Sequence, residues 1–187
     1  LNASTLEGYL FSKTYKLYEN TSPEEALQLF YKGFTDFFVD SLKQRAKKIG
    51  FTVHQVLTLA SIIKGETNQA DEMPTISAVY HNRLRIGMSL QADPTIQYLL
   101  PGGWRRLTYA DLKIDSPYNT YKYAGLPPGP INNPGKNAII AALYPEKNNY
   151  LYFVAGGNGG HKFAKSYSDH LKNVAQYRKW LKEQNNQ

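Results

Sequence analysis

The residue most able to do chemistry in this sequence is a glutamate in an apolar setting. Glu66 lies near the end of the stretch "ASIIKGETN", residues 60–68, and Val56, Ala60 and Ile63 precede it at the spacing of one helix face. Continuing that face places Glu66 on the inward side of the last turn. A carboxyl at the edge of an apolar face resists ionisation, so its pKa is expected to rise toward ~6, which suits a general acid at neutral pH. The competing interpretation is a solvated glutamate in a fraying turn.

The histidine and cysteine patterns predict no metal centre and no cofactor. The chain has no cysteine, which excludes thiolate zinc sites and a cysteine nucleophile. The histidines show no paired spacing that would clamp a metal; they are His54, His81, His161 and His170. His161 follows a glycine-rich run, residues 156–160, which predicts a hairpin tip, with substrate contact as the alternative.

Serine catalysis and nucleic-acid binding are also disfavoured. No serine stands in a G-x-S-x-G elbow. Lysine and arginine outnumber aspartate and glutamate by 22 to 15, so the partner is expected to be anionic: a nucleic acid, a lipid surface or an acidic polymer. The basic residues are spread out rather than blocked, which favours a solvated face over a nucleic-acid stripe; they include Arg83, Arg85, Arg105, Arg106 and Lys113.

Capping signals predict the helices that position the glutamate. Thr52 and Gln55 form a capping box, in which each side chain bonds the backbone N–H of the other residue. The same pattern at Ser22 and Glu25 starts either one long helix or two helices broken near Gly33. Helical spacing, prolines and glycine stops predict helices over residues 22–50, 52–67, 73–87, 93–100, 135–145 and 168–184.

The second half of the chain has a different texture. Residues 107–130 alternate aromatics with turn formers and prolines, which predicts an extended ribbon and a stiff surface loop. The segments "NYLYFVA" and "HKFAKS" flank the glycine-rich run and predict an antiparallel hairpin. The predicted fold class is therefore α+β: one mainly helical domain over residues 1–187 with a small antiparallel sheet.

Several long motifs, taken in order, resemble one family. They are "LEGYLF", "ASIIKGET", "NRLRIGMSLQADPTIQY", "DSPYNTY", "GLPPGPINNPG" and "YLYFVA" followed by "GGHKF". The sequence is similar to the catalytic domain of the MltG family of endolytic murein transglycosylases, also called YceG-like. The resemblance covers nearly the whole chain, and it implies a lysozyme-like catalytic cleft.

The resemblance also implies an activity and a setting. Family members are peptidoglycan lyases that cut glycan strands between N-acetylmuramic acid (MurNAc) and N-acetylglucosamine (GlcNAc), leaving a 1,6-anhydro-MurNAc end. The implied partners are the glycan strands and, through the wall-synthesis machinery, penicillin-binding proteins, with no nucleic acid. The family implies a single-pass protein of the cell membrane with the enzyme outside the cytoplasm. Its usual upstream LysM-like segment and anchor are not in this sequence.

The family's catalytic glutamate corresponds to Glu66. It is the second glutamate of an E-K-E-T pattern, from which Lys64 and Gly65 depart at the first two positions. Residues two apart on a helix face different ways, so Glu66 is expected to work without an acid at position 64. A lytic enzyme uses the sugar's own 6-hydroxyl as nucleophile, so one carboxyl can serve as acid and then as base.

The substrate-binding residues expected around Glu66 come from four segments. Tyr118, Asn119 and Tyr121 are expected to contact the N-acetyl group and the sugar face. Gln91, Asp93 and Thr95 are expected to line the cleft or hold its loops, and His161 to contact substrate. Asp93 has a simpler alternative, because it precedes Pro94 and could only cap a short helix.

Two other functions stay open on the sequence. A hydrolytic muramidase would pair Glu66 with Asp93 as the second carboxylate, because hydrolysis of a glycosidic bond usually needs two. An inactive glycan-binding module is the other alternative, motivated by the departures at Lys64 and Gly65.

Overall fold

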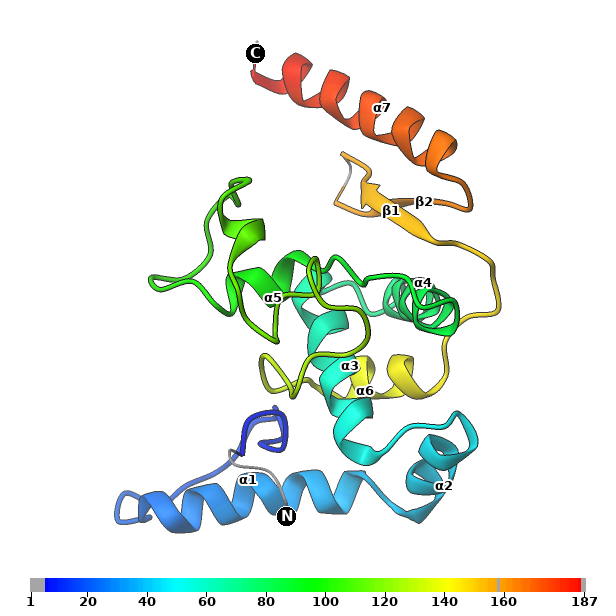
Figure 1. Cartoon of the computed structure of the whole chain (residues 1–187). Coiled ribbons are helices and arrows are strands. Elements are labelled where there is room, and N and C mark those ends of the chain that lie inside the picture. The colour runs from blue at the N-terminus through cyan, green and yellow to red at the C-terminus, as the bar shows by residue number, and fades with distance from the viewer. Residues whose placement is uncertain (1–5, 158, 186–187) are drawn as a thin grey trace.

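The computed structural model describes residues 6–157 and 159–185, and these residues have the predicted α+β class. Most of the elements are helices, and the described residues also form a two-stranded antiparallel sheet (Figure 1). In chain order the elements are α1 (Pro23–Phe37), α2 (Asp40–Lys48), α3 (Val53–Glu66), α4 (Met73–Arg85), α5 (Asp93–Gln97), the 3-10 helix η1 (Asp111–Lys113), α6 (Lys136–Leu143), β1 (Tyr152–Ala155), β2 (His161–Ala164) and α7 (Tyr167–Asn185).

Helix α3 is the centre of the core. Its residues 56–63 are all buried, an unbroken run that a helix shows only where other elements cover it on all sides. The covering elements include α4, α5 and α6, which pack against it (Figure 1). Burying one aliphatic side chain stabilises a fold by about 1.5–3 kcal/mol, so this run holds the end of α3 firmly in place.

The predicted capping boxes before α1 and α3 are confirmed. Thr52 Oγ1 accepts a hydrogen bond from the Gln55 N–H (3.1 Å), and Gln55 Oε1 accepts one from the Thr52 N–H (2.8 Å). Ser22 and Glu25 make the same pair of bonds at the start of α1. Both helices therefore begin at the residues that the sequence predicts.

Of the two options for residues 22–50, two helices are observed instead of one, but the predicted position of the break near Gly33 is wrong. Gly33 lies within α1, and the chain leaves the helix at Phe38 before α2 begins. A Cβ at Gly33 would lie 2.3 Å from Tyr15 Oη, so this glycine makes room for a packed tyrosine instead of ending the helix. Phe38 is buried in the core, and its burial fixes the turn between the two helices.

The ribbon predicted over residues 107–130 is also wrong. This segment consists of turns and the short helix η1, and it forms no strand. Asn119 is fully buried, and its side-chain amide donates to Leu112 O (3.0 Å) and Ile114 O (2.7 Å). A buried amide therefore organises this loop, in place of the strand pairing that the alternating aromatics suggested.

The predicted hairpin and final helix are confirmed. Strand β1 pairs antiparallel with β2, with Tyr152 opposite Ala164 and Ala155 opposite His161. Helix α7 packs on this hairpin, at the opposite end of the molecule from α1 (Figure 1). None of the described residues of α7 is buried, so the hairpin lies between an exposed helix and the core.

Two fully buried serines on neighbouring helices give a matched test of this packing. In α3, Ser61 Oγ donates to Thr58 O (2.7 Å) and accepts from the Ile131 N–H (3.0 Å). In α4, Ser77 Oγ has no hydrogen-bond partner within the described part of the chain.

We expect Ser61→Ala to lower the free energy of unfolding by about 1–3 kcal/mol, because it leaves the buried Ile131 N–H without an acceptor. The same change at Ser77 removes an unpaired polar atom and is expected to be neutral or stabilising. Urea unfolding of both variants measures the difference. Equal losses for the two would contradict this view of the core.

Candidate active site

The Glu66 carboxyl meets a buried tyrosine at the end of α3. Tyr80 Oη donates a hydrogen bond to Glu66 Oε1, and Tyr80 is fully buried. Burial raises the pKa of Glu66, the Tyr80 hydrogen bond and the charge of Arg83 lower it, and the charge of Asp93 raises it, so that the pKa lies at about 7 instead of 4.5. The prediction of an inward carboxyl with a raised pKa is confirmed.

Helix α4 supplies two side chains that the sequence analysis did not assign to the site. Tyr80 and Arg83 follow Ile76 along one buried face of α4, at the spacing i, i+4, i+7. Arg83 Nε donates to Leu151 O (2.7 Å), and a second guanidinium nitrogen donates to Leu90 O. The prediction of a solvated Arg83 is therefore wrong, because these carbonyls replace water around its charge. Its helical spacing from Ile76 was the signal that could have found it.

Asp93 does not cap α5. The cap position belongs to Ala92, which makes no side-chain bond to the helix, and Asp93 is the first helical residue. The Asp93 carboxylate instead accepts a hydrogen bond from Tyr121 Oη. Burial and this hydrogen bond raise the pKa of Tyr121, so the phenol stays protonated. The structure thus brings Asp93 and Tyr121 together near Glu66, where the negative charge of Asp93 raises the pKa of Glu66.

A buried hydrogen-bond network ties the segment before α5 to residues 119–121. Thr95 is fully buried, and its Oγ1 donates to Ala92 O (2.7 Å) and lies 2.9 Å from Thr120 Oγ1. The Ala92 N–H donates to Thr120 Oγ1 (3.0 Å), and the Gln91 N–H donates to Thr120 O (3.0 Å). Gln91 has φ +48°, a left-handed conformation that costs a non-glycine residue roughly 1–2 kcal/mol. The network offsets this strain and holds Gln91 exposed beside Asp93.

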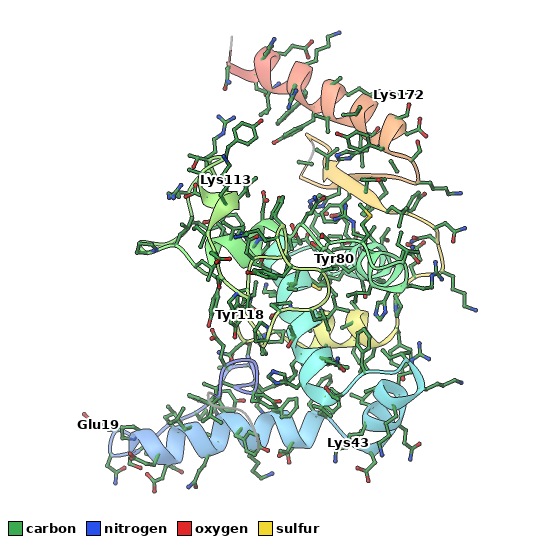
Figure 2. All side chains as sticks on the ribbon, viewed as in Figure 1. Glu19, Lys43, Tyr80, Lys113, Tyr118 and Lys172 are labelled. Atoms are coloured by element: carbon green, nitrogen blue, oxygen red, sulfur yellow. The ribbon has the colours of Figure 1, made fainter. Side chains whose placement is uncertain are left out.

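The structure does not bring Asn119 and Tyr118 to the open side of Glu66. Asn119 is buried, and its Oδ1 accepts from the Tyr121 N–H (2.9 Å), so it orients Tyr121 from inside the protein. The Tyr118 ring packs 5.0 Å from the Tyr98 ring, between centroids. Figure 2 labels Tyr118 and Tyr80 at two separate places in the middle of the molecule.

Glu66 borders a hollow of 440 Å³, which we call the acid hollow. It is lined by residues 64–69 together with Trp104, Gly159 and His161. The Gln69 side-chain amide donates to Gly159 O, which joins the end of α3 to the hairpin turn. Trp104 and Gln69 were not predicted as site residues, because both lie in loops where no spacing in the sequence marks them.

His161 faces the acid hollow from β2, held by an acidic partner. Its Nδ1 lies 2.8 Å from Glu72 Oε2, and its backbone N–H donates to Glu72 Oε1 (2.7 Å). The carboxylate thus fixes both the ring and the strand that carries it. Among the predicted substrate-binding residues, only His161 lines the acid hollow in the described part of the chain.

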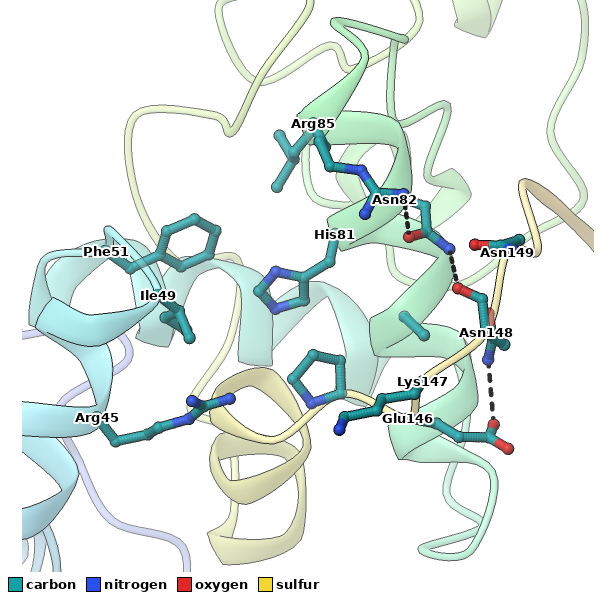
Figure 3. A pocket seen from close by; sticks show the side chains of 13 residues that line it. Arg45, Ile49, Phe51, His81, Asn82, Arg85, Glu146, Lys147, Asn148 and Asn149 are labelled. Atoms are coloured by element: carbon teal, nitrogen blue, oxygen red, sulfur yellow. Dashed lines mark hydrogen bonds between the residues drawn. The ribbon is translucent and has the colours of Figure 1, made fainter.

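A larger hollow, of 840 Å³, lies on another part of the molecule (Figure 3). Its lining comes from α2, α4, Ile49, Phe51 and residues 145–149. The His81 ring stacks on the Phe51 ring at 5.2 Å between centroids. None of the site residues expected from the sequence is in its lining. Size alone therefore does not identify the site.

The described residues 6–157 and 159–185 contain no group of three or more His, Asp or Glu side chains that could hold a metal ion. Among the same residues, no helix combines the length and apolar character needed to cross a membrane. What the site at Glu66 offers chemically is a carboxyl that can give and take a proton near neutral pH.

The raised pKa of Glu66 predicts a pH dependence of stability. The unfolded carboxyl ionises near pH 4.5 and the folded one near pH 7, so the folded state binds the proton more tightly between these values. Stability therefore falls as the pH rises through this window, by about 2 kcal/mol between about pH 5 and about pH 8. Urea unfolding of the wild type and of Glu66→Gln across this range checks it. Parallel curves for the two proteins would contradict the prediction.

Comparison with known proteins agrees with the motifs. The sequence matches the YceG-like family over residues 1–176. It is 43% identical over 173 residues to a protein of Bacillus subtilis (strain 168) and 35% identical over 182 residues to one of Streptococcus pneumoniae serotype 2 (strain D39), both named endolytic murein transglycosylase. Each match covers 92% of this chain but only 48% and 32% of the relatives, so the chain spans half of their length or less.

The fold is also shared with a solved structure. The crystal structure of a yceG-like protein from Listeria monocytogenes is 42% identical and superposes with a TM-score of 0.81, over 89% of this chain and 54% of that one. The resemblance inferred from the motifs is confirmed by these matches in sequence and in fold. The chain belongs to the YceG-like family.

Proposed function

We propose that this chain is the catalytic part of an endolytic murein transglycosylase, a lyase that cuts glycan strands of peptidoglycan with Glu66 as its single acid and base. The proposal rests on the Glu66 carboxyl, which lines an open hollow and has a pKa of about 7. Both protonation states of Glu66 are therefore populated near neutral pH. A general acid–base works best when its pKa lies near the working pH. The names of the relatives support the choice of substrate.

The proposed reaction balances without water. Protonated Glu66 gives its proton to the glycosidic oxygen while the bond from that oxygen to C1 of MurNAc breaks. The 6-hydroxyl oxygen of the same MurNAc bonds to C1, and its proton passes to the Glu66 carboxylate. The products are a GlcNAc 4-hydroxyl end and a 1,6-anhydro-MurNAc end, and Glu66 returns to its starting state.

The groups around Glu66 suit both halves of this cycle. Burial and the charge of Asp93 favour the protonated acid, whereas Arg83 and the Tyr80 hydrogen bond favour the carboxylate that takes the proton back. Burial and the charge of Glu66 raise the pKa of Tyr80, so its hydroxyl keeps its proton and always donates. The site thereby stabilises neither protonation state strongly.

The predicted substrate-binding residues divide by their exposure. We assign contact with the glycan to the side chains that reach the surface near Glu66, which are Gln91, Asp93, Tyr121 and His161. Asn119 and Thr95 are buried, so we assign them to positioning the loops. Tyr118 packs on Tyr98 and would contact only a longer strand.

For the longer protein we infer a place at the cell membrane. The relatives extend well beyond the matched region, and the family's usual LysM-like segment and anchor would put this domain on the extracytoplasmic side. Glycan strands there lie beside the penicillin-binding proteins that make them, which are the protein partners we propose.

Two alternatives keep specific support. A hydrolytic muramidase is favoured by the charge of Asp93 acting on Glu66, because two carboxylates could then share the work. An inactive glycan-binding module is suggested by Lys64 and Gly65. Both departures have local explanations: Lys64 Nζ bonds the Asn68 side chain, and a Cβ at Gly65 would lie 2.6 Å from Pro94 Cβ.

Glu66→Gln tests the assignment of the acid. Glutamine can still accept the Tyr80 hydrogen bond but cannot deliver a proton, so we expect an unchanged fold and a rate of anhydro-muropeptide release lowered by ~10²–10⁴-fold. Mass spectrometry of products from purified peptidoglycan measures it, with the exposed Glu24→Gln as the matched control. Undiminished release by Glu66→Gln would refute the assignment, and binding without any turnover by the wild type would favour the inactive module.

Asp93→Asn separates the lyase from the hydrolase. In the lyase, losing the Asp93 charge lowers the pKa of Glu66, so activity persists while its alkaline limit moves to lower pH. A hydrolase that needs two carboxylates would lose ~10²-fold or more and would release products one water heavier. The pH–rate profile and product masses of this variant distinguish the two outcomes.

A further inference from the structure

We propose that Trp104 is the stacking platform of a sugar-binding subsite next to Glu66, and that a sugar seated there sets which glycosidic bond reaches the acid. The inference rests on the proposed function and deepens it, because it assigns a ligand contact to a side chain with no other role in the fold. Its support comes from the shape of the surface, the exposure of Trp104 and the polar groups around it.

Trp104 stands between two adjoining hollows. One is the acid hollow, and the second is a smaller hollow of 190 Å³ between the end of α3 and α5, which we call the side hollow. Trp104 and Gly65 line both. Gly65 carries no side chain that could divide them, and its close approach to Pro94 explains the glycine there. The two hollows therefore adjoin at the indole of Trp104 and at Gly65.

Trp104 is exposed in a way that folding does not explain. Its exposed fraction is 73%, and within the described residues no other aromatic ring packs against it. Neighbouring contacts nevertheless hold its loop. Arg105 makes two hydrogen bonds to Asp111 (2.8 and 2.6 Å), and the Gln97 side chain donates to Arg105 O. An exposed aromatic ring whose loop is already held in place can contact a ligand at a low cost in ordering.

The amide groups around the indole suit a hydroxyl-rich ligand. Asn68 and Gln69 line the acid hollow, and Gln97 and Asn132 line the side hollow. Each of these amides already makes a hydrogen bond within the protein and keeps further donor or acceptor positions for a ligand. Amides both donate and accept hydrogen bonds, as sugar hydroxyls and N-acetyl groups require. The flat indole supplies the apolar face on which the C–H side of a pyranose ring can stack. The indole and the amides together suit an amino-sugar chain, and the acid hollow also presents Lys64, Glu66 and His161 to it.

Binding to a protein that cannot cut tests the subsite directly. In a Glu66→Gln background we compare Trp104→Ala with Trp104→Phe, and use Tyr109→Ala as the matched control, because Tyr109 is 87% exposed in the same loop but lines neither hollow. The probes are the soluble tetramer of β-1,4-linked N-acetylglucosamine and peptide-free murein glycan strands. Calorimetry gives the dissociation constants.

We expect Trp104→Ala to weaken binding about tenfold or more, Trp104→Phe to recover most of the loss, and Tyr109→Ala to bind like its parent. Unchanged binding by Trp104→Ala, an equal loss in Tyr109→Ala, or no binding by the parent would each overturn the subsite. The reaction is judged separately, in the protein that keeps Glu66. If the protein turns over glycan but its binding does not depend on Trp104, the subsite is refuted and the proposed lyase stands. If binding depends on Trp104 but there is no turnover, the proposed lyase is refuted and the subsite stands.

Discussion

The site depends on one balance: a carboxyl that is buried enough to hold its proton and paired well enough to take it back. Burial alone would keep Glu66 neutral, and the Tyr80 hydrogen bond with Arg83 alone would keep it ionised. Their opposition leaves the pKa at about 7. The negative charge of Asp93 also raises the pKa of Glu66, which favours its protonated form. Single-residue acid–base chemistry requires such a poised group, because the same carboxyl must act in both directions.

The fold supplies this balance by fixing three segments around one point. Helix α3 begins after its Thr52 cap, passes through the core and ends at Glu66. The buried packing of this helix therefore fixes the position of the carboxyl. Helix α4 lies against it and brings Tyr80 and Arg83 to the same place. The loop organised by Asn119 brings Tyr121 to Asp93, and the network around Thr120 fixes that loop to α5. Arg83 is buried at low cost because backbone carbonyls accept its hydrogen bonds.

Much of this arrangement could be read from local patterns in the sequence. Capping boxes located the starts of α1 and α3, and the apolar stripe ending at Glu66 predicted its inward carboxyl. The same stripe rule applied to α4 would have found Arg83. Other features depend on contacts between distant segments, which no local pattern records. The glycine at position 33 makes room for Tyr15, and the Asn119 side chain bonds the backbone carbonyl of Leu112. Trp104 lines two hollows that both include Gly65.

The central claim concerns the proton on Glu66, and a titration of that carboxyl tests it most directly. With ¹³C-labelled glutamate side chains, the carboxyl resonance that disappears in Glu66→Gln can be followed by NMR as the pH is raised. We expect a midpoint near 7, well above the ordinary value of 4.5. A midpoint close to 4.5 would mean that Glu66 is an ordinary solvated carboxylate and would rule out its role as both acid and base.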